Sequence, residues 1–352
     1  MQPAAYINAI STASPAHDVH GAFVRWAAGQ IPDDRERAIF ARMAKRAAID
    51  HRWSVLPPPA PDRSQIDTGG FYDRNAWPGT AQRMAVYARE APILAERAAT
   101  GLGRLEEVTH LVLASCTGFV APGVDQLLAQ RLGLRPDVER TLIGFMGCYA
   151  AVAALRTAYH ITRSQPQALI LVVTVELSTL HLQKATDLES LLAMLLFADG
   201  AAAALVSARP AGLEIMDPFS VALADSADMI TWKVTNTGFA MGLSGEVPGR
   251  IAGALAATDL CDRLQAGGST DNWAVHGGGR SILDAVERGL DLPADALDAS
   301  RAVLRDYGNM SSATLMFVLA RILDSATEPA AGAALAFGPG LAVEGFRYRS
   351  PR

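Results

Sequence analysis

The stretch Gly144-Phe145-Met146-Gly147-Cys148-Tyr149-Ala150-Ala151 decides how the rest of the chain is interpreted, because it places a cysteine between two regular elements. Before it, residues 141–145 form a short apolar segment that predicts a buried strand. After it, residues 149–163 are rich in Ala and Leu at helical spacing, and Pro166 follows as a stop. The sequence therefore predicts a strand, a tight turn and a helix, with Cys148 at the turn.

A cysteine at the start of a helix is a candidate nucleophile. The first turn offers unpaired backbone N–H groups and a partial positive charge, which stabilise a thiolate and lower the thiol pKa. Small residues beside Cys148 would also let a bulky thioester approach. The alternative is a structural cysteine, because free Cys is among the most buried residue types.

Further segments on both sides of this stretch predict an α/β protein with two similar halves. Residues 108–115, 168–175 and 201–206 also predict buried strands. A second series begins near Leu213, with a strand at 272–275, helices at 281–289 and 311–323, and a terminal pair around Gly338-Pro339-Gly340. Pro and Gly in residues 208–213 favour a boundary there, giving halves at 1–208 and 209–352. The Pro-rich residues 56–61 are interpreted as a surface loop, with a domain linker as the alternative.

Composition restricts the class of protein. The chain has 352 residues, of which 50% are apolar and 19% charged, enough for a large core and two packed units. A net charge of -5 argues against a nucleic-acid partner, so any anion site must be local. Three cysteines are too few for a disulfide framework or a Cys-rich metal site, which favours a reducing cytoplasm. We expect neither a signal peptide nor a membrane span, since a span needs about 20 apolar residues in a row.

Two more motifs carry polar residues at predicted element ends. Trp273-Ala274-Val275-His276-Gly277-Gly278-Gly279 places a histidine after a buried strand and before a glycine run that lets backbone approach closely. This run lacks the spacing of the common nucleotide loops, so nucleotide binding is the weaker interpretation. Tyr307-Gly308-Asn309-Met310-Ser311-Ser312 places an amide before a helix, where an ordinary N-cap is the alternative.

The three motifs together suggest one chemistry. A cysteine can hold an acyl chain as a thioester, while an imidazole and a neutral amide donate hydrogen bonds to an oxygen that becomes negatively charged. These are the groups that a decarboxylative condensation requires. Cys148, His276 and Asn309 are therefore the predicted catalytic residues.

In this order, the motifs resemble those of type III polyketide synthases, such as the plant chalcone and stilbene synthases. Further matching strings are Ser115-Cys116-Thr117-Gly118, Leu196-Phe197-Ala198-Asp199-Gly200-Ala201, Val247-Pro248-Gly249 and Phe337-Gly338-Pro339-Gly340-Leu341. The resemblance implies a thiolase-like fold, with two α/β halves in αβαβα layers. It also implies Cys148 as acyl carrier, His276 and Asn309 as the oxyanion hole, and Phe197 as an aromatic gate. Acyl-CoA and malonyl-CoA are the implied substrates, with no metal or redox cofactor and a homodimer whose interface lies near Ala121.

The resemblance extends to the CoA phosphates. Arg42 and Arg46 match cationic positions of the family, and Ser281 is a third candidate contact. A solvated helix face is the alternative for the two arginines. Ile39 stands where the plant enzymes carry another cation, and Ala336 opens the terminal signature where Gly is usual, so the match is incomplete.

Departures from the plant enzymes bear on the substrate. Ala121 stands at the position of a methionine, and its small size predicts a side tunnel for a long alkyl chain. Trp232 stands at a pocket glycine and leaves less room for ring closure through carbon, which favours α-pyrones over resorcinols. The remaining predicted pocket residues are Cys116, Thr117, His181, Met241 at the second gate, and Ser311. These features resemble bacterial alkylpyrone and alkylresorcinol synthases.

Other functions stay open at this stage. A fatty-acid-initiating β-ketoacyl synthase shares the Cys-His-Asn set but stops after one condensation. Papain-like hydrolases use the same residue types to transfer an acyl group to water. An inactive acyl-CoA-binding homologue is a third alternative, and an acyl carrier protein could deliver the primer in place of CoA.

Overall fold

The computed structural model describes residues 3–59, 66, 70–72, 77–265, 270–325 and 330–350. Within these residues nine strands form one mixed sheet in the order β11-β12-β13-β8-β1-β7-β6-β4-β5. The strands are β1 (Ala5–Ala13), β4 (His110–Ser115), β5 (Glu139–Gly144), β6 (Ile170–Leu177), β7 (Asp199–Ser207), β8 (Leu213–Ala222), β11 (Asn272–Val275), β12 (Ala331–Gly338) and β13 (Ala342–Arg349). Only three residue pairs join the two parts of this sheet, between Ala5–Ile7 of β1 and Leu213–Ile215 of β8.

The same pairing pattern occurs twice. In the N-terminal part β4 runs parallel to β6, which pairs antiparallel with β7, which pairs antiparallel with β1. In the C-terminal part β11 runs parallel to β12, which pairs antiparallel with β13, which pairs antiparallel with β8. This repetition confirms the expectation of similar α/β units, while the boundary at residue 208 stays a prediction.

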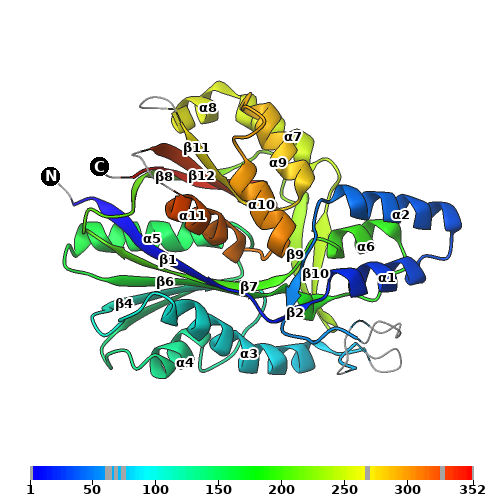
Figure 1. Ribbon diagram of the computed structural model, residues 1–352, viewed down its shortest axis with the longest axis horizontal. Coiled ribbons are helices and arrows are strands. Elements are labelled where there is room, and N and C mark those ends of the chain that lie inside the picture. The colour runs from blue at the N-terminus through cyan, green and yellow to red at the C-terminus, as the bar shows by residue number, and fades with distance from the viewer. Residues whose placement is uncertain are drawn as a thin grey trace.

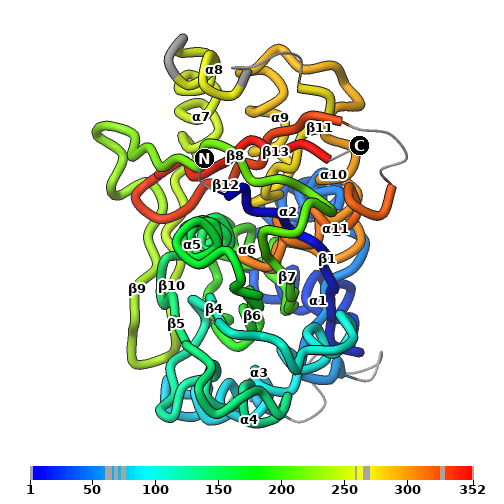
Figure 2. Tube along the Cα trace, turned by 90° about the vertical axis from the view of Figure 1, so that its left-hand side faces the viewer, coloured from blue at the N-terminus to red at the C-terminus, as the bar shows by residue number. Residues whose placement is uncertain are grey.

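Helices separate and cover the two parts in five layers (Figure 1). Helices α3 (Thr80–Thr100) and α4 (Val124–Arg131) cover one outer face, and α5 (Ala150–Ser164) and α11 (Ala313–Ser325) lie between the two parts. The other outer layer holds α7 (Val247–Ala256), α8 (Thr258–Gln265), α9 (Arg280–Gly289) and α10 (Asp298–Tyr307). Figure 2 looks along α5 and shows it between the layers. The predicted αβαβα arrangement of a thiolase-like fold is confirmed.

The sequence explains why α5 can occupy the centre. Ala150, Ala151, Ala154 and Ala158 are fully buried, and their small side chains let the helix backbone approach both parts of the sheet closely. Strands β4 and β6 are buried along their whole length because helices cover both faces, which is why they are nearly continuous apolar runs. The helix therefore carries its first turn, next to Cys148, deep into the molecule.

The expectation of a buried strand at residues 141–145 is wrong in part. A strand is present, β5, but it pairs only with β4 at the sheet edge and most of its residues are exposed. Leu142 is 49% exposed, and Phe119, whose ring contacts that of Phe145 just after the strand, is 50% exposed. Apolar content alone could not distinguish an interior strand from an edge strand of this kind.

A smaller assembly lies beside the layers. It contains α1 (His20–Gln30), α2 (Asp34–Arg46), α6 (Leu188–Met194), the short strands β2 (His17–Asp18) and β3 (Trp53–Ser54), and the hairpin of β9 (Ile230–Thr235) and β10 (Gly238–Leu243). Helices α1, α2 and α6 share one apolar cluster that includes Phe23, Trp26 and Phe40. Figure 1 shows α1, α2 and α6 at one end of the layers, with the hairpin β9–β10 next to them.

Candidate active site

Cys148 lies in the turn between β5 and α5, one residue before the helix N-cap Tyr149. The turn is unusual because Phe145 and Gly147 both have positive φ, 58° and 80°. A Cβ at Gly147 would lie 2.3 Å from Cδ of Pro339, so the cysteine turn packs directly on the terminal Gly-Pro-Gly segment. Tyr149 strengthens this contact by donating its hydroxyl to the carbonyl of Pro339 at 3.3 Å. The two sequence motifs, nearly 200 positions apart, thus form one structural unit.

Asn309 is linked to Cys148 through Ser311. Ser311 Oγ donates to Cys148 Sγ at 3.7 Å, and its backbone N–H donates to Oδ1 of Asn309 at 2.8 Å. Ser311 has a φ of 50°, a conformation that non-glycine residues rarely adopt and that often marks a functional site. Asn309 is therefore not the ordinary helix cap considered above, since α11 begins only at Ala313.

His276 is close to this arrangement through the glycine run that follows it. Asn309 Nδ2 donates to the carbonyl of Gly278 at 3.1 Å, and a Cβ at Gly278 would lie only 3.6 Å from Nε2 of His276. Since Oδ1 of Asn309 accepts from Ser311, the orientation of the amide is defined, and one N–H of Nδ2 remains for a ligand. The structure thus links Cys148 to Asn309 through Ser311, and Asn309 to the glycine run that follows His276.

Burial governs the protonation of this set. Desolvation raises the pKa of Cys148 to about 12, and the nearby carboxylate of Glu176 adds to the effect despite the Ser311 hydrogen bond. Desolvation also lowers the pKa of His276 to about 4, and neither ring nitrogen has a partner among the described residues. Burial therefore outweighs the lowering of the thiol pKa that was expected from the helix N-terminus, and it favours the neutral forms of both the thiol and the imidazole.

The motif analysis missed the role of Glu176. This fully buried carboxylate accepts hydrogen bonds from the N–H of Cys116 at 3.0 Å, from Thr117 Oγ1 at 2.8 Å and from the hydroxyl of Ser312. Burial raises its pKa. Cys116 Sγ also lies 3.1 Å from Ser311 Oγ, so Glu176 connects to the hydroxyl that contacts Cys148. A lone acidic residue inside the apolar strand 170–177 was the available signal.

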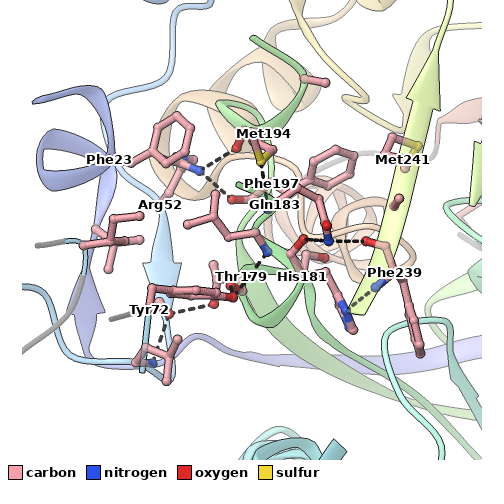
Figure 3. A pocket seen from close by; sticks show the side chains of 18 of the residues that line it. Phe23, Arg52, Tyr72, Thr179, His181, Gln183, Met194, Phe197, Phe239 and Met241 are labelled. Carbon is pink, nitrogen blue, oxygen red and sulfur yellow. Dashed lines mark hydrogen bonds between the residues drawn. The ribbon is translucent and has the colours of Figure 1, made fainter. Parts of the chain in front are cut away.

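Phe197 connects this set to a cavity. Its backbone forms an isolated bridge with Asn309, made possible by Gly308, whose φ is 71° and where a Cβ would meet Arg52 at 2.8 Å. Arg52 Nη1 holds the same segment by donating to the carbonyls of Phe197 and Met194 at 2.8 and 3.1 Å. Phe197 and Met241, the two predicted gate positions, both line the cavity, which has a volume of about 190 Å³ (Figure 3).

An aromatic group packs against one side of the cavity. The His181 ring stacks on Phe239 with centroids 4.2 Å apart, and Trp232 contacts both rings edge-on. His181 Nε2 donates to the carbonyl of Thr117 at 2.7 Å while Nδ1 accepts from the N–H of Phe239 at 3.0 Å, so the ring is neutral, and burial lowers its pKa to about 3. Trp232 Nε1 donates to the carbonyl of Cys116 at 2.8 Å.

Ala121 lies outside the cavity lining. It is exposed at the surface, in the segment between β4 and α4. Cys261, the third free thiol, is on α8 and is likewise outside the cavity lining.

The predicted CoA contacts gather at the meeting of two helices. Arg42 and Arg46 are exposed on the last turns of α2, and Ser281 is exposed in the first turn of α9. Arg280 Nη1 donates to the carbonyl of Arg46 at 3.4 Å and brings the two helix ends together. Arg280 is a further cation at this place, missed in the sequence although it adjoins Ser281.

In the part of the chain that the structure describes, no group of three or more His, Cys, Asp and Glu side chains could hold a metal ion. None of the helices in the described part of the chain is both long enough and apolar enough to cross a membrane.

Comparison with known proteins agrees with this geometry. Residues 2–210 match the N-terminal domain, and residues 215–351 the C-terminal domain, of chalcone and stilbene synthases. The α-pyrone synthesis polyketide synthase-like Pks18 of Mycobacterium tuberculosis is 36% identical over 285 residues, 76% of this chain and 72% of Pks18. Bisdemethoxycurcumin synthase of Oryza sativa is 36% identical over 301 residues, 78% of this chain and 74% of its own.

Solved structures give the same answer. PKS-I of the brown alga Ectocarpus siliculosus superposes with a TM-score of 0.89 at 27% identity, over 100% of this chain and 99% of that one. The type III polyketide synthase domain of Steely1 from Dictyostelium superposes with a TM-score of 0.88 at 26% identity, over 99% of each. The protein therefore belongs to the chalcone and stilbene synthase family, the type III polyketide synthases, which are acyltransferases that condense malonyl-CoA with CoA-thioester substrates.

Proposed function

We propose that Cys148 carries a long-chain fatty acyl starter through repeated decarboxylative condensations with malonyl-CoA, and that the product is released as an alkyl-α-pyrone. The observation that carries this proposal is the chain of contacts from Cys148 through Ser311 and Asn309 to Gly278 beside His276. It supports an arrangement in which the thiol, a free amide N–H and the imidazole act on one reacting centre.

The protonation states support a concerted loading step. A neutral His276 can accept the Sγ proton as the thiolate attacks the thioester carbonyl, so no standing ion pair is required. The free N–H of Asn309 and an imidazole N–H then stabilise the oxyanion, and CoA leaves with the proton. In the next step malonyl-CoA loses carbon dioxide. The same two donors stabilise the enolate, whose carbon attacks the acyl-Cys148 thioester and returns the chain to CoA.

The shape of the site favours lactone formation. Trp232 is fixed by its bond to Cys116 and by contacts with His181 and Phe239, so it narrows the space beside Cys116. A pyrone forms when an enol oxygen attacks the thioester carbonyl, which requires less folding of the chain than closure through carbon. The name of Pks18, which refers to α-pyrone synthesis, is in line with this choice.

We also propose that the enzyme works as a homodimer joined near β5. An edge strand with exposed apolar side chains is a ready surface for association. Leu142 of β5 is exposed here, and so is Phe119 in the segment after β4. Ala121 is exposed in the same region, between β4 and α4.

Labelled malonyl-CoA with a panel of acyl-CoA starters tests the proposal, with Cys148→Ala as control and mass analysis of products. Triketide and tetraketide pyrones from long-chain starters, absent with the variant, are the expected result. A single condensation would favour the ketoacyl synthase alternative, and free fatty acid alone would favour a hydrolase. Equal turnover of short or aromatic starters would contradict the long-chain assignment. Running the panel with acyl carrier protein thioesters would show which carrier delivers the primer.

A further inference from the structure

Ala121 is not among the described residues that line the cavity beside Phe197. The lining comes from α1, from the segment around β3, from α6 and from the hairpin β9–β10. It is mostly apolar and includes Phe23, Leu56, Ala193, Met194, Phe239 and Met241. Figure 3 shows Phe23, Arg52 and Tyr72 on one side and His181, Phe239 and Met241 on the other.

Aromatic rings close one side of the cavity. Phe119, Phe145 and Phe239 contact one another with ring centroids 5.3 to 5.8 Å apart. The stack of His181 on Phe239 and the edge contacts of Trp232 extend this aromatic cluster to the cavity wall. An alkyl chain that passed between these rings toward Phe119, two residues before Ala121, would have to displace them.

The polar groups of the cavity are largely satisfied within the protein. Thr179 Oγ1 donates to Asp199, and Ser54 Oγ lies 2.7 Å from Thr179 Oγ1. Arg52 is the only Lys, Arg, Asp or Glu among the described lining residues, and its guanidinium lies 4.5 Å over the ring of Phe23. Its Nη1 is bonded to two carbonyls, while Nη2 has no partner among the described residues. The surface left for a ligand is mostly aliphatic and aromatic carbon.

The proposal that follows rests on the proposed function. We propose that the alkyl tail of the starter runs from Cys148 past Phe197 into the cavity between α1 and α6, and that Phe23, Ala193 and Met194 limit its length. Each methylene transferred there from water would strengthen binding, so a dodecanoyl chain would gain far more than a butanoyl chain. Selectivity for long starters would then reside in α1 and α6 and not at the dimer edge.

Replacing a small wall residue tests the assignment. Ala193→Phe would fill the cavity, and we expect kcat/KM for dodecanoyl-CoA to fall at least tenfold, with that for butanoyl-CoA changed less than twofold. Phe23→Ala would enlarge the cavity and shift the preferred starter to longer chains, a gain that a folding defect could not produce. Ala121→Met, which adds the bulk that plant enzymes carry, should change the dodecanoyl-to-butanoyl ratio less than twofold.

Several results would overturn the assignment. A tenfold loss of dodecanoyl turnover in Ala121→Met would place the tail at the surface edge. Loss of malonyl-CoA decarboxylation in Ala193→Phe, in equal proportion to dodecanoyl turnover, would mean that the cavity holds the pantetheine arm. Faster turnover of ω-carboxydodecanoyl-CoA than of dodecanoyl-CoA would show that Arg52 recognises a carboxylate. If wild-type enzyme forms no polyketide from any starter, the proposed function itself fails; dodecanoyl loading of Cys148 in the same variants, measured by protein mass, still tests the cavity.

Discussion

Gly147→Ala should damage both stability and activity, because Gly147 joins the cysteine turn to the terminal Gly-Pro-Gly segment. A non-glycine residue at a φ of 80° costs about 1–2 kcal/mol. The new Cβ would also lie 2.3 Å from Cδ of Pro339, against an optimal separation of about 3.5–4.0 Å, so one backbone must move by more than an ångström. Overpacking of this kind costs about 1–3 kcal/mol, giving a total of roughly 2–5 kcal/mol.

Gly133→Ala is the matched control. Gly133 also has a positive φ, 63°, but a Cβ there would meet nothing within 4 Å, so only the conformational cost of about 1–2 kcal/mol applies. Thermal unfolding and malonyl-CoA decarboxylation should be measured for both variants. We expect the melting temperature of Gly147→Ala to lie clearly below that of Gly133→Ala, and the decarboxylation rate to fall at least tenfold in Gly147→Ala alone, since the adjoining Cys148 would shift. Equal melting temperatures and equal rates for the two variants would refute the reasoning.

Three further predictions concern the thiol, the product and the assembly. Because burial keeps the thiol of Cys148 protonated, its alkylation by iodoacetamide at pH 7 should be about three orders of magnitude slower than that of a free cysteine of pKa about 8.5. The alkylation rate, measured by peptide mass, should rise about tenfold per pH unit through pH 9, whereas a plateau between pH 6 and 8 would indicate an ion pair with His276. Trp232→Gly should widen the space beside Cys116 and add resorcinols to the pyrones in the product mixture; an unchanged product profile would count against the steric argument. Leu142→Arg places a charge on the exposed edge strand and should convert a dimer into monomers in light scattering at micromolar concentration; an unchanged mass, or a monomeric wild type, would contradict the proposed interface.

Local pattern was sufficient to predict most elements of the fold. Residues 272–275 form the predicted strand. The predicted helix at 149–163 differs from α5 by one residue at each end, and that at 281–289 differs from α9 by one residue at its start. The predicted helix at 311–323 begins later, at Ala313, because Ser311 has a left-handed conformation that a helix cannot contain. These successes depend on continuous burial and helical spacing, which are recorded directly in the order of residues.

The sequence pattern could not show where in the sheet a predicted strand lies. The segment 141–145 is as apolar as a buried strand, yet β5 lies at the edge, since only three-dimensional pairing shows which strand has one neighbour. For the same reason Ala121 could be predicted beside a tunnel but lies at the surface, outside the cavity.

Electrostatics showed a similar limit. A helix N-terminus after Cys148 predicts a lowered thiol pKa, but the depth of burial outweighs the helix, and the nearby Glu176 carboxylate was not considered. The candidate catalytic residues could be named from three short motifs, whereas the hydrogen bonds around them involve Ser311 and Gly278, residues whose importance only the fold makes visible.

The most direct test of the account is the site of acylation. The enzyme would be mixed with dodecanoyl-CoA in the absence of malonyl-CoA, quenched in acid, digested and analysed by peptide mass. We predict a dodecanoyl mass increment on the peptide that contains Cys148, and none on the peptides that contain Cys116 or Cys261. Acylation of Cys116 in its place, or unchanged acylation of the protein after Cys148→Ala, would contradict the assignment of Cys148 as the acyl carrier.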